Sequence, residues 1–265
     1  MKRTRITPDL TALPEEFHSL LSNAAVYDSS CSREARVLFV DLEGGIYIKR
    51  AAAGSLSREA TMAKYFHSLG LGVPVIDYRT VGEQDFLVTL RAEGEDGTHP
   101  SHLAQPERLC DLLATTLRAL HETAAPDCPV PDHTALYLQT AQENAARGMF
   151  DPAYLLGDAL RSTVKNAIDA YAIVEREGKQ LACDTLLHGD YCLPNVMLKD
   201  WRVSALIDLD HAGIGDRHVD LYWGAWTLNY NLGHDNLRSR FFDAYGRDRV
   251  DEEMIKLISI IETLG

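Results

Sequence analysis

The chain has 265 residues, 46% of them hydrophobic, so it can bury a sizeable core in one large domain or in two lobes. Its net charge is −13 and no run of lysine or arginine stands out, which argues against a nucleic-acid partner and suits a cationic one. Because no apolar run is as long as a membrane span and no signal-peptide core follows the basic start, we expect a cytoplasmic protein with no membrane partner.

The first ninety residues are predicted to be rich in β-strands. Alternating apolar residues and turn signals give the order strand, strand, helix, strand, strand over residues 36–40, 45–50, 56–70 and, for the last pair, 73–92. The turn between the first two strands is expected at residues 43–45. Ser57 is the expected N-cap of the helix, and Gly70 is its expected stop.

The composition changes after a polar, Gly-rich break at residues 93–100. Residues 106–122, 151–177 and 216–265 are predicted to be largely helical, and two short strands are expected at residues 195–198 and 203–209. The pattern indicates an α+β fold with a small β-rich N-terminal lobe at residues 1–90, a hinge linker at 91–97 and a larger, mostly helical C-terminal lobe at 98–265.

Three polar side chains recur at short intervals between the apolar segments of residues 186–210. Asp190 lies on the loop that enters the predicted hairpin, while Asn195 and Asp208 fall at adjacent strand ends. Carboxylate and amide groups flanked by apolar runs are costly unless something binds them. Mg²⁺ on a nucleotide needs only one or two protein oxygens, because phosphates and waters complete its octahedron. Asn195 and Asp208 are therefore candidate metal ligands.

The spacing of these residues is similar to that of the catalytic loop of protein kinases, H-R-D-x-x-x-x-N, in which the Asp accepts the substrate proton. Here His188-Gly189-Asp190 is followed by four residues and then by Asn195. A kinase also needs a strand Lys and a helix Glu that together hold the nucleotide phosphates. Lys49 on the second predicted strand and Glu59 on the following helix occur in the required order.

The chain resembles the aminoglycoside phosphotransferases, specifically the 3′-phosphotransferase (kanamycin kinase) group. The resemblance covers nearly the whole chain and is best from about Ser101 onward. It rests on LRALHETAAPDCP, LLHGDYCLPNVML, ALIDLDHAGIGDRHVDL and the closing MIKLISIIETLG. It implies a two-lobed protein-kinase-like fold with a nucleotide-binding N-terminal lobe and a catalytic and substrate-binding C-terminal lobe.

The resemblance also implies roles on the nucleotide side. Asp190 would orient the acceptor hydroxyl, Asn195 and Asp208 would coordinate Mg²⁺, and Lys49, paired with Glu59, would contact the phosphates of ATP (or GTP). The backbone of the linker from Leu90 to Ala92 would receive the adenine, and residues 29–37 resemble the nucleotide-positioning loop of the family.

On the substrate side, members of the family bind the ammonium groups of the drug with carboxylates. Glu262 matches one of these positions, and Gly265 would provide the terminal carboxylate. After the metal-binding aspartate the family usually has Gly-Arg, whereas this chain has Asp210-His211. We therefore expect His211 to lie at the substrate pocket and to alter its specificity.

The expected activity is transfer of the γ-phosphoryl group of ATP to a hydroxyl, the 3′-hydroxyl first of all, of an aminoglycoside antibiotic, by a monomer or a weak homodimer, which would confer antibiotic resistance. One alternative is a related kinase of another small alcohol, such as choline, homoserine, a sugar or a macrolide. A second is a catalytically silent binding protein on the same fold. A protein kinase ranks third, because no activation loop follows Asp208.

Several other polar and aromatic residues are interpreted structurally. His188 is expected to pack and to form hydrogen bonds that hold the catalytic loop, and Asp216 and Asp220 are expected to be structural rather than to react. Trp223, Trp226 and Tyr230 stand at helical spacing, which favours packing within the helical lobe over a stacking platform for a ligand.

Overall fold

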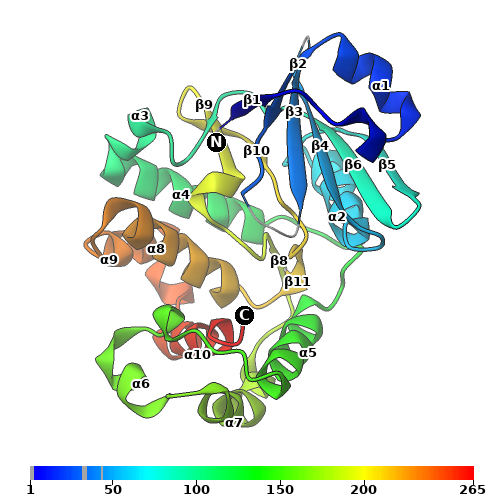
Figure 1. Ribbon diagram of the computed structural model, residues 1–265. Helices are drawn as coiled ribbons and strands as arrows, with labels where there is room; N and C mark the ends of the chain where they lie inside the picture. Colours follow the sequence, from blue (N-terminus) through cyan, green and yellow to red (C-terminus); the bar gives the residue numbers. More distant parts are fainter. Residues whose placement is uncertain (1–2, 32–34, 43) are drawn as a thin grey trace. The chain divides into compact units, whose positions relative to one another are not determined.

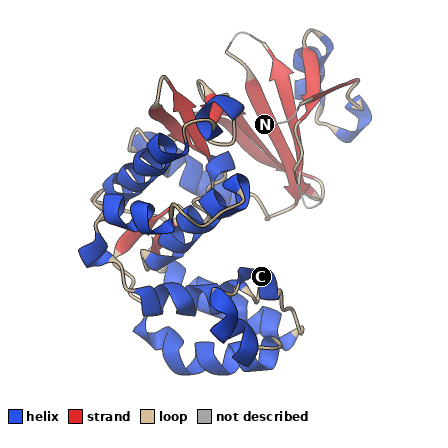
Figure 2. Ribbon diagram, turned by 90° about the vertical axis from the view of Figure 1, so that its left-hand side faces the viewer, coloured by secondary structure: helices blue, strands red, loops and turns tan. Residues whose placement is uncertain are grey.

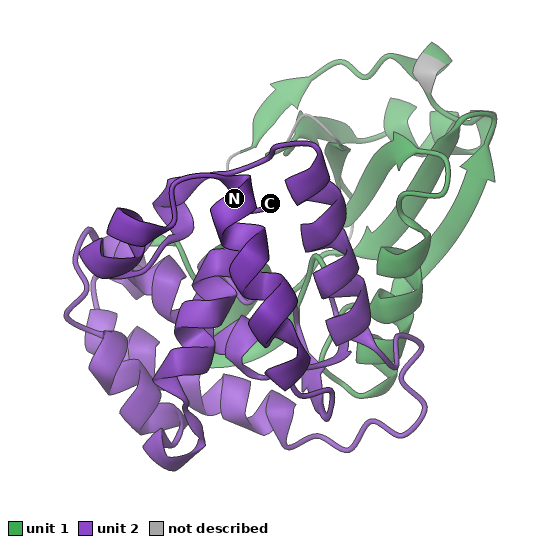
Figure 3. Ribbon diagram, turned by 90° about the horizontal axis from the view of Figure 1, so that it is seen from below, with its two compact units in different colours: residues 1–100, 194–210 green, residues 101–193, 211–265 purple. Residues whose placement is uncertain are grey.

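The computed structural model describes residues 3–31, 35–42 and 44–265 (Figure 1). The chain divides into two compact units: unit 1 comprises residues 1–100 and 194–210, and unit 2 comprises residues 101–193 and 211–265 (Figure 3). Strands concentrate in unit 1 and helices in unit 2 (Figure 2), which confirms the expected α+β composition. No helix in the described ranges is long and apolar enough to cross a membrane.

Unit 1 is built on a six-stranded antiparallel sheet. Its strands, in spatial order, are β1 (Thr4–Ile6), β2 (Ala25–Asp28), β3 (Arg36–Asp41), β4 (Ile46–Ala52), β6 (Gln84–Leu90) and β5 (Val75–Val81). The sequence predicted the four strands from β3 to β6, but not β1 and β2. The helices of this unit are η1 (Leu10–Ala12), α1 (Glu15–Ser22) and α2 (Ser57–Ser68).

The two faces of the sheet carry different helices because alternate residues of a strand point to opposite sides. On one face Ile46 and Ile48 of β4 pack in a core with Phe17 and Leu21 of α1. On the other face, Leu87 of β6 packs against Leu56 and Ala60 at the start of α2. Lys49 follows Ile48 and is the register partner of Leu87, so it lies on the α2 face.

A second sheet in unit 1 has the order β10 (Arg202–Leu206), β9 (Val196–Lys199) and β7 (Glu95–Asp96). β9 and β10 are joined by Asp200 and Trp201, with φ of 50° and 58°; two successive positive φ values are those of a type I′ hairpin turn. Val196 opposes Leu206 at the open end of this hairpin. The turn and the register therefore place the residues that flank β9 and β10 side by side.

The compact units divide the chain differently from the expected lobes. Residues 194–210 were expected in the C-terminal lobe, but they group with unit 1. The physical reason is hydrogen bonding: β9 pairs with β7, and the Leu206 N–H donates to the Leu71 carbonyl at 2.8 Å. For the same reason residues 91–97 are not a plain linker, because β7 lies within them.

Unit 2 is mostly helical. Its helices are α3 (Pro100–Leu103), which begins at the boundary, α4 (Pro106–His121), α5 (His133–Ala146), η2 (Pro152–Tyr154), α6 (Gly157–Thr163), α7 (Ala167–Glu177), η3 (Gly178–Gln180), α8 (His218–Leu232), α9 (Arg238–Tyr245), η5 (Arg247–Arg249) and α10 (Glu252–Glu262). Strands β8 (Thr185–Leu187) and β11 (Gly213–Gly215) form an antiparallel pair, and η4 (Leu193–Asn195) links the units along the chain.

One expectation about helix ends is wrong, and one is confirmed. Residues 151–177 are largely helical, as expected, in the form of η2, α6 and α7, and Asn166 caps α7 by accepting from the Ile168 and Asp169 N–H groups. Ser57 is not the N-cap of α2 but its first residue. The N-cap residue is Leu56, whose side chain makes no capping hydrogen bond. Gly70 follows the helix with φ +74°, as expected of a stop.

Candidate active site

Unit 1 contains a cavity of about 260 Å³. Its walls are largely apolar and include Val37, Val73, Leu87, Met197, Leu206 and Ile207. The structure brings six of the predicted site residues to it: Lys49, Glu59, Leu90, Ala92, Asn195 and Asp208. Residues 32–34 of the segment that resembles a nucleotide-positioning loop lie outside the described residues, whereas Ser29, Cys31, Ala35 and Val37 line the cavity.

The centre of the polar side of this cavity is the ammonium group of Lys49. Its Nζ lies 2.7 Å from Glu59 Oε2 and 2.8 Å from Asp208 Oδ1. Burial alone would lower the pKa of Lys49, but the charges of Asp208 and Glu59 outweigh it and raise that pKa above its usual value. Burial raises the pKa of Glu59 to about 7, against the opposing effect of the Lys49 charge. The cation is thus held between two carboxylates from different elements.

A buried carboxylate that the sequence analysis did not single out fixes the start of α2. Asp85 of β6 is fully buried and accepts hydrogen bonds from the Leu56 N–H at 3.0 Å, the Thr80 hydroxyl at 2.7 Å and the Tyr78 hydroxyl at 3.1 Å. It thereby satisfies a helix N-terminal donor, the task that had been assigned to Ser57. Glu59 lies about one helical turn after Leu56. The hydrogen bond from Leu56 to Asp85 therefore helps to fix where the Glu59 side chain meets Lys49. The signal available in the sequence was a single acidic residue, Asp85, within the predicted strand segment QDFLVTL.

Asn195 and Asp208 end up close to one another through the hairpin that separates them. The Ile207 N–H donates to the Asn195 carbonyl at 3.1 Å, just beyond the ladder of β9 and β10. Asp208 has φ +61°, a left-handed conformation that non-glycine residues adopt at a cost of about 1–3 kcal/mol. Such strain is retained where the surrounding contacts demand it, here where the carboxylate reaches Lys49.

A second ion pair, unforeseen from the sequence, lies next to the first. Arg58 Nε and Nη2 approach Asp210 Oδ1 and Oδ2 at 3.3 and 3.2 Å, so the guanidinium meets the carboxylate with two nitrogens. Arg58 immediately precedes Glu59, and Asp210 lies two residues after Asp208. The pair therefore ties the N-terminal turn of α2 to the segment that follows β10, in parallel with the bridge through Lys49.

The residues of the cavity suit a magnesium ion that is carried by a nucleotide. In the described part of the chain, no group of three or more His, Cys, Asp or Glu side chains is arranged to hold a metal ion. An amide oxygen and a carboxylate, from Asn195 and Asp208, both line the cavity. They match the one or two protein oxygens that Mg²⁺ takes when phosphates supply the other ligands.

In unit 2, the loop that carries Asp190 is held by a fully buried carboxylate. Asp220 of α8 accepts the His188 N–H at Oδ2 and the Gly189 N–H at Oδ1, both at 2.8 Å, and its Oδ2 lies 3.1 Å from His121 Nε2. Burial alone would raise the pKa of Asp220, but the hydrogen bond and charge of His121 and the contacts with His188 keep it low. Asp220 is therefore structural, as the sequence indicated, and the structure shows that it holds the Asp190 loop.

Gly189 is required for the shape of this loop. Its φ is +84°, and a Cβ at this position would lie 1.8 Å from the carbonyl oxygen of His211. His188, whose side chain is fully buried, contacts Tyr191 edge-on with ring centroids 6.0 Å apart, and its Nδ1 lies 3.3 Å from the Asp190 N–H. The backbone around Asp190 is thus fixed from both sides, as expected for His188.

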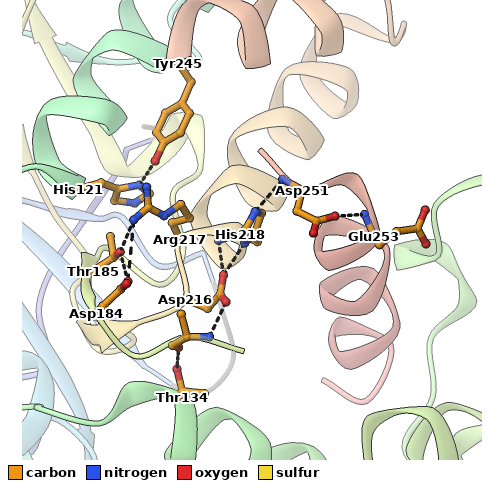
Figure 4. Close-up of polar contacts among 11 residues, drawn as sticks. His121, Thr134, Asp184, Thr185, Asp216, Arg217, His218, Tyr245, Asp251 and Glu253 are labelled. Atoms are coloured by element: carbon orange, nitrogen blue, oxygen red, sulfur yellow. Dashed lines mark hydrogen bonds and ion pairs between the residues drawn. The ribbon is translucent and has the colours of Figure 1, made fainter. Parts of the chain in front are cut away.

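A hydrogen-bonded chain joins β11 and α8 to the start of α10 (Figure 4). Asp216 Oδ2 accepts the Ala182 N–H at 2.7 Å, and its Oδ1 lies 2.6 Å from His218 Nδ1. The Asp251 N–H donates to His218 Nε2 at 3.0 Å. Because Nε2 accepts, Nδ1 carries the proton and donates to Asp216. Asp216 is therefore structural, as predicted, and it orients the helix that carries Glu262.

The remaining predicted residues also lie in unit 2. Glu262 Oε1 accepts from the Tyr137 hydroxyl at 2.7 Å and from Trp223 Nε1 at 3.0 Å; burial raises its pKa to about 7, and the charge of Asp190 adds to the rise. The Gly265 carbonyl accepts from Asn144 Nδ2 at 2.5 Å. His211 is exposed, and its backbone carbonyl and Cβ lie close to Gly189.

A profile of the phosphotransferase enzyme family matches residues 32–255, and so covers most of the cavity lining and the Asp190 loop. The chain belongs to this family. A probable aminoglycoside 3′-phosphotransferase of Lactococcus lactis subsp. lactis is 45% identical over 265 residues, which are 100% of this chain and 99% of that protein. An aminoglycoside 3′-phosphotransferase of Niallia circulans is 29% identical over 70% of each chain. The resemblance stated from the sequence is confirmed.

Solved structures of phosphotransferases share the fold. An aminoglycoside-3′-phosphotransferase of type VIII matches with a TM-score of 0.73 and 24% identity over 89% of this chain and 92% of that one. APH(3″)-Id from Streptomyces rimosus in complex with ADP and streptomycin matches with a TM-score of 0.74 and 22% identity over 97% and 98%. These matches confirm the two-lobed kinase-like fold expected for this phosphotransferase.

Proposed function

We propose that this phosphotransferase moves the γ-phosphoryl group of ATP to the 3′-hydroxyl of an aminoglycoside. The observation that carries the proposal is the cavity of unit 1, in which Lys49 is held between Glu59 and Asp208 beside the amide of Asn195. The 45% identity over the full chain to a probable aminoglycoside 3′-phosphotransferase supports the choice of acceptor.

On the nucleotide side, the apolar walls of the cavity would hold the adenine, and Lys49 would contact the phosphates. The N–H groups of Leu90 and Arg91 already donate to the Pro74 and Gly45 carbonyls, each at 3.0 Å. The Ala92 N–H would therefore be the linker donor that forms a hydrogen bond with the adenine. When bound, Mg²⁺ would neutralise phosphate charge, and Asn195 and Asp208 would hold it.

On the acceptor side, Asp190 would accept a hydrogen bond from the attacking hydroxyl and orient its oxygen. The acceptor oxygen forms a bond to the γ-phosphorus, and the bond from that phosphorus to the β,γ-bridging oxygen breaks. ADP leaves, and the hydroxyl proton passes to the Asp190 carboxylate. Phosphoryl transfer depends mainly on positioning and on stabilised charge, so the rigid loop around Asp190 serves the reaction directly.

The test is ADP release from Mg-ATP with two aminoglycosides that differ at the acceptor. Kanamycin has the 3′-hydroxyl, whereas tobramycin lacks it. Turnover with kanamycin and none with tobramycin is expected. Turnover with both would move the reaction to another hydroxyl, and ATP binding without turnover of either would contradict the aminoglycoside assignment.

A second candidate is phosphorylation of another small alcohol, and the segment after Asp208 favours it most. Asp210 is engaged by Arg58 and is followed by His211, where related enzymes usually have Gly-Arg. If tobramycin and kanamycin both fail, the same ADP-release assay with choline, homoserine and a macrolide would identify this alternative.

A further inference from the structure

Four aromatic rings form a continuous strip on unit 2. The strip consists of Tyr154 of η2 and of Trp223, Trp226 and Tyr230 of α8, which recur every three to four residues on one face of the helix. Tyr154 lies 5.7 Å from Trp223 and 6.0 Å from Trp226, centroid to centroid. Trp223 meets Trp226 edge-on at 5.3 Å, and Trp226 stacks on Tyr230 at 4.8 Å with an interplanar angle of 13°.

The outer end of this aromatic strip is not buried. Tyr230 is 71% exposed, so packing within the helical lobe, the interpretation favoured by the sequence, is wrong for this residue. Trp223 and Trp226 are partly buried rather than enclosed. A contiguous exposed aromatic surface commonly marks a binding site, because leaving it in water is unfavourable.

The inner end of the strip is continuous with the carboxylates proposed for the acceptor site. Trp223 Nε1 donates to Glu262 Oε1 at 3.0 Å. Burial is the main reason that the pKa of Tyr154 is raised, and the charges of Glu262 and Asp190 add to the rise. The strip therefore begins at Glu262 and runs along α8 to the exposed ring of Tyr230.

We propose that the aromatic strip is a stacking subsite for the sugar rings of the acceptor that lie beyond the phosphorylated ring. The inference rests on the proposed function and deepens it. A sugar presents a flat face of C–H groups that packs against an aromatic ring, and its ammonium substituents are attracted to the negative face of the same ring. Because Trp226 and Tyr230 stack on each other, the face open to a sugar is the outer face of the exposed Tyr230 phenol, which Trp226 supports from behind.

The charges around the strip suit a cationic aminoglycoside better than a neutral apolar partner. Glu262 contacts Trp223 at the inner end of the strip, and the charge of Asp190 adds to the raised pKa of Glu262. The chain as a whole carries a net charge of −13. Carboxylates bind the ammonium groups of such a substrate, whereas an aromatic face packs against the sugar ring that carries them. A substrate of three linked rings, such as kanamycin, can use both, with its phosphorylated ring at Asp190 and its distal ring at Tyr230.

The experiment compares kinetic constants for kanamycin between wild type and single variants. Tyr230→Ala removes the exposed ring and should raise KM for kanamycin about three-fold, and Trp226→Ala should raise it about ten-fold, with KM for Mg-ATP unchanged. Tyr230→Phe keeps the stacking face and should stay close to wild type. Asn229→Ala changes an exposed neighbour on α8 and should leave all constants within about two-fold.

The size of the acceptor provides a second measurement. Neamine, a two-ring aminoglycoside with a 3′-hydroxyl, lacks the distal ring, so Tyr230→Ala should change its KM less than that of kanamycin. Because Tyr230 is exposed, this variant tests the subsite even if Trp226→Ala does not fold. Equal effects on both substrates, or no effect on either, would overturn the subsite.

The outcomes separate the two proposals. Kanamycin turnover by wild type with unchanged KM in Tyr230→Ala and Trp226→Ala overturns the stacking subsite and leaves the proposed function intact. If wild type neither turns over nor binds kanamycin in a calorimetric titration, both proposals fail. A change in molar mass in solution on Tyr230→Ala, with kinetics unchanged, would assign the strip to self-association and would also overturn the subsite.

Discussion

The two units of this phosphotransferase hold their candidate site carboxylates in different ways. In unit 1, Glu59 and Asp208 are bound to Lys49, and Asp210 is bound to Arg58. In unit 2, Glu262 is held by the neutral donors of Tyr137 and Trp223. An ion pair fixes geometry and cancels charge, whereas a neutral donor fixes geometry and leaves the charge. The first arrangement suits a nucleotide pocket, and the second suits the capture of a cation.

The largest effect that would test this contrast is expected at Asp190. Asp190→Asn should lower kcat about 10³-fold, because the attacking hydroxyl loses its proton acceptor, while KM for Mg-ATP stays unchanged. Asp248→Asn, at an exposed position of the same unit, is the control and should behave as wild type. Near-normal turnover in Asp190→Asn would remove Asp190 from the chemistry.

The next effect concerns the metal ligands proposed in unit 1. Asp208→Asn and Asn195→Ala should each raise the Mg²⁺ concentration for half-maximal turnover about ten-fold, because each removes one of two protein oxygens. Asp200→Asn, at the exposed turn of the same hairpin, is the matched control and should leave the Mg²⁺ titration nearly unchanged. An unaltered titration in Asp208→Asn would exclude it as a ligand.

The pairing of Arg58 with Asp210 should have a smaller effect. Both side chains are about one-third exposed, so the pair contributes about 1 kcal/mol or less to stability. Arg58→Asp should raise KM for Mg-ATP about three-fold, since α2 loses one of its two ties, and the exchange Arg58→Asp with Asp210→Arg should restore part of the loss.

A matched pair far from the cavity serves as the control for this exchange. Arg240 meets Asp111 with two nitrogens, each 2.7 Å from a carboxylate oxygen, on the surface of unit 2. Arg240→Ala should leave the kinetic constants unchanged. If Arg58→Asp and Arg240→Ala behave alike, the Arg58 pair has no role in positioning Glu59 and Asp208.

The smallest expected effect is a pH dependence that originates from Glu262, whose pKa is raised to about 7. Only its ionised form attracts an ammonium group, so KM for kanamycin should fall about three-fold as the pH rises from 6 to 7.5. In Glu262→Gln this dependence should flatten. A dependence that persists in Glu262→Gln would assign the titration to another group.

The raised pKa of Glu262 also predicts that the stability of the fold changes with pH. Its folded-state pKa lies above the ordinary value of 4.5, so the protonated side chain stabilises the fold below that value. This contribution is lost as the pH rises through about 7. The thermal midpoint of wild type should therefore fall relative to that of Glu262→Gln between pH 5 and pH 8.

Much of the unit 1 cavity could be predicted because its parts are local and ordered along the chain. The spacing of Asn195 and Asp208 after Asp190 matched a kinase motif, and the same comparison required Lys49 and Glu59, whose strand and helix follow from periodicity and turn signals. Asp85 and the Arg58–Asp210 pair could not be predicted, because no motif includes them and their partners lie 29 and 152 residues away. Neither contact leaves a periodic trace in the sequence.

The order of the residues sets which chemical groups this protein has and how closely they follow one another, from Asp190 to Asn195 and on to Asp208. That residues 194–210 group with unit 1 follows instead from tertiary contacts, since it depends on the pairing of β9 with β7. Likewise, helical spacing placed Trp226 and Tyr230 on one face of α8, but not at its surface. The pattern of a segment fixes which residues share a face, whereas burial depends on what distant segments cover that face.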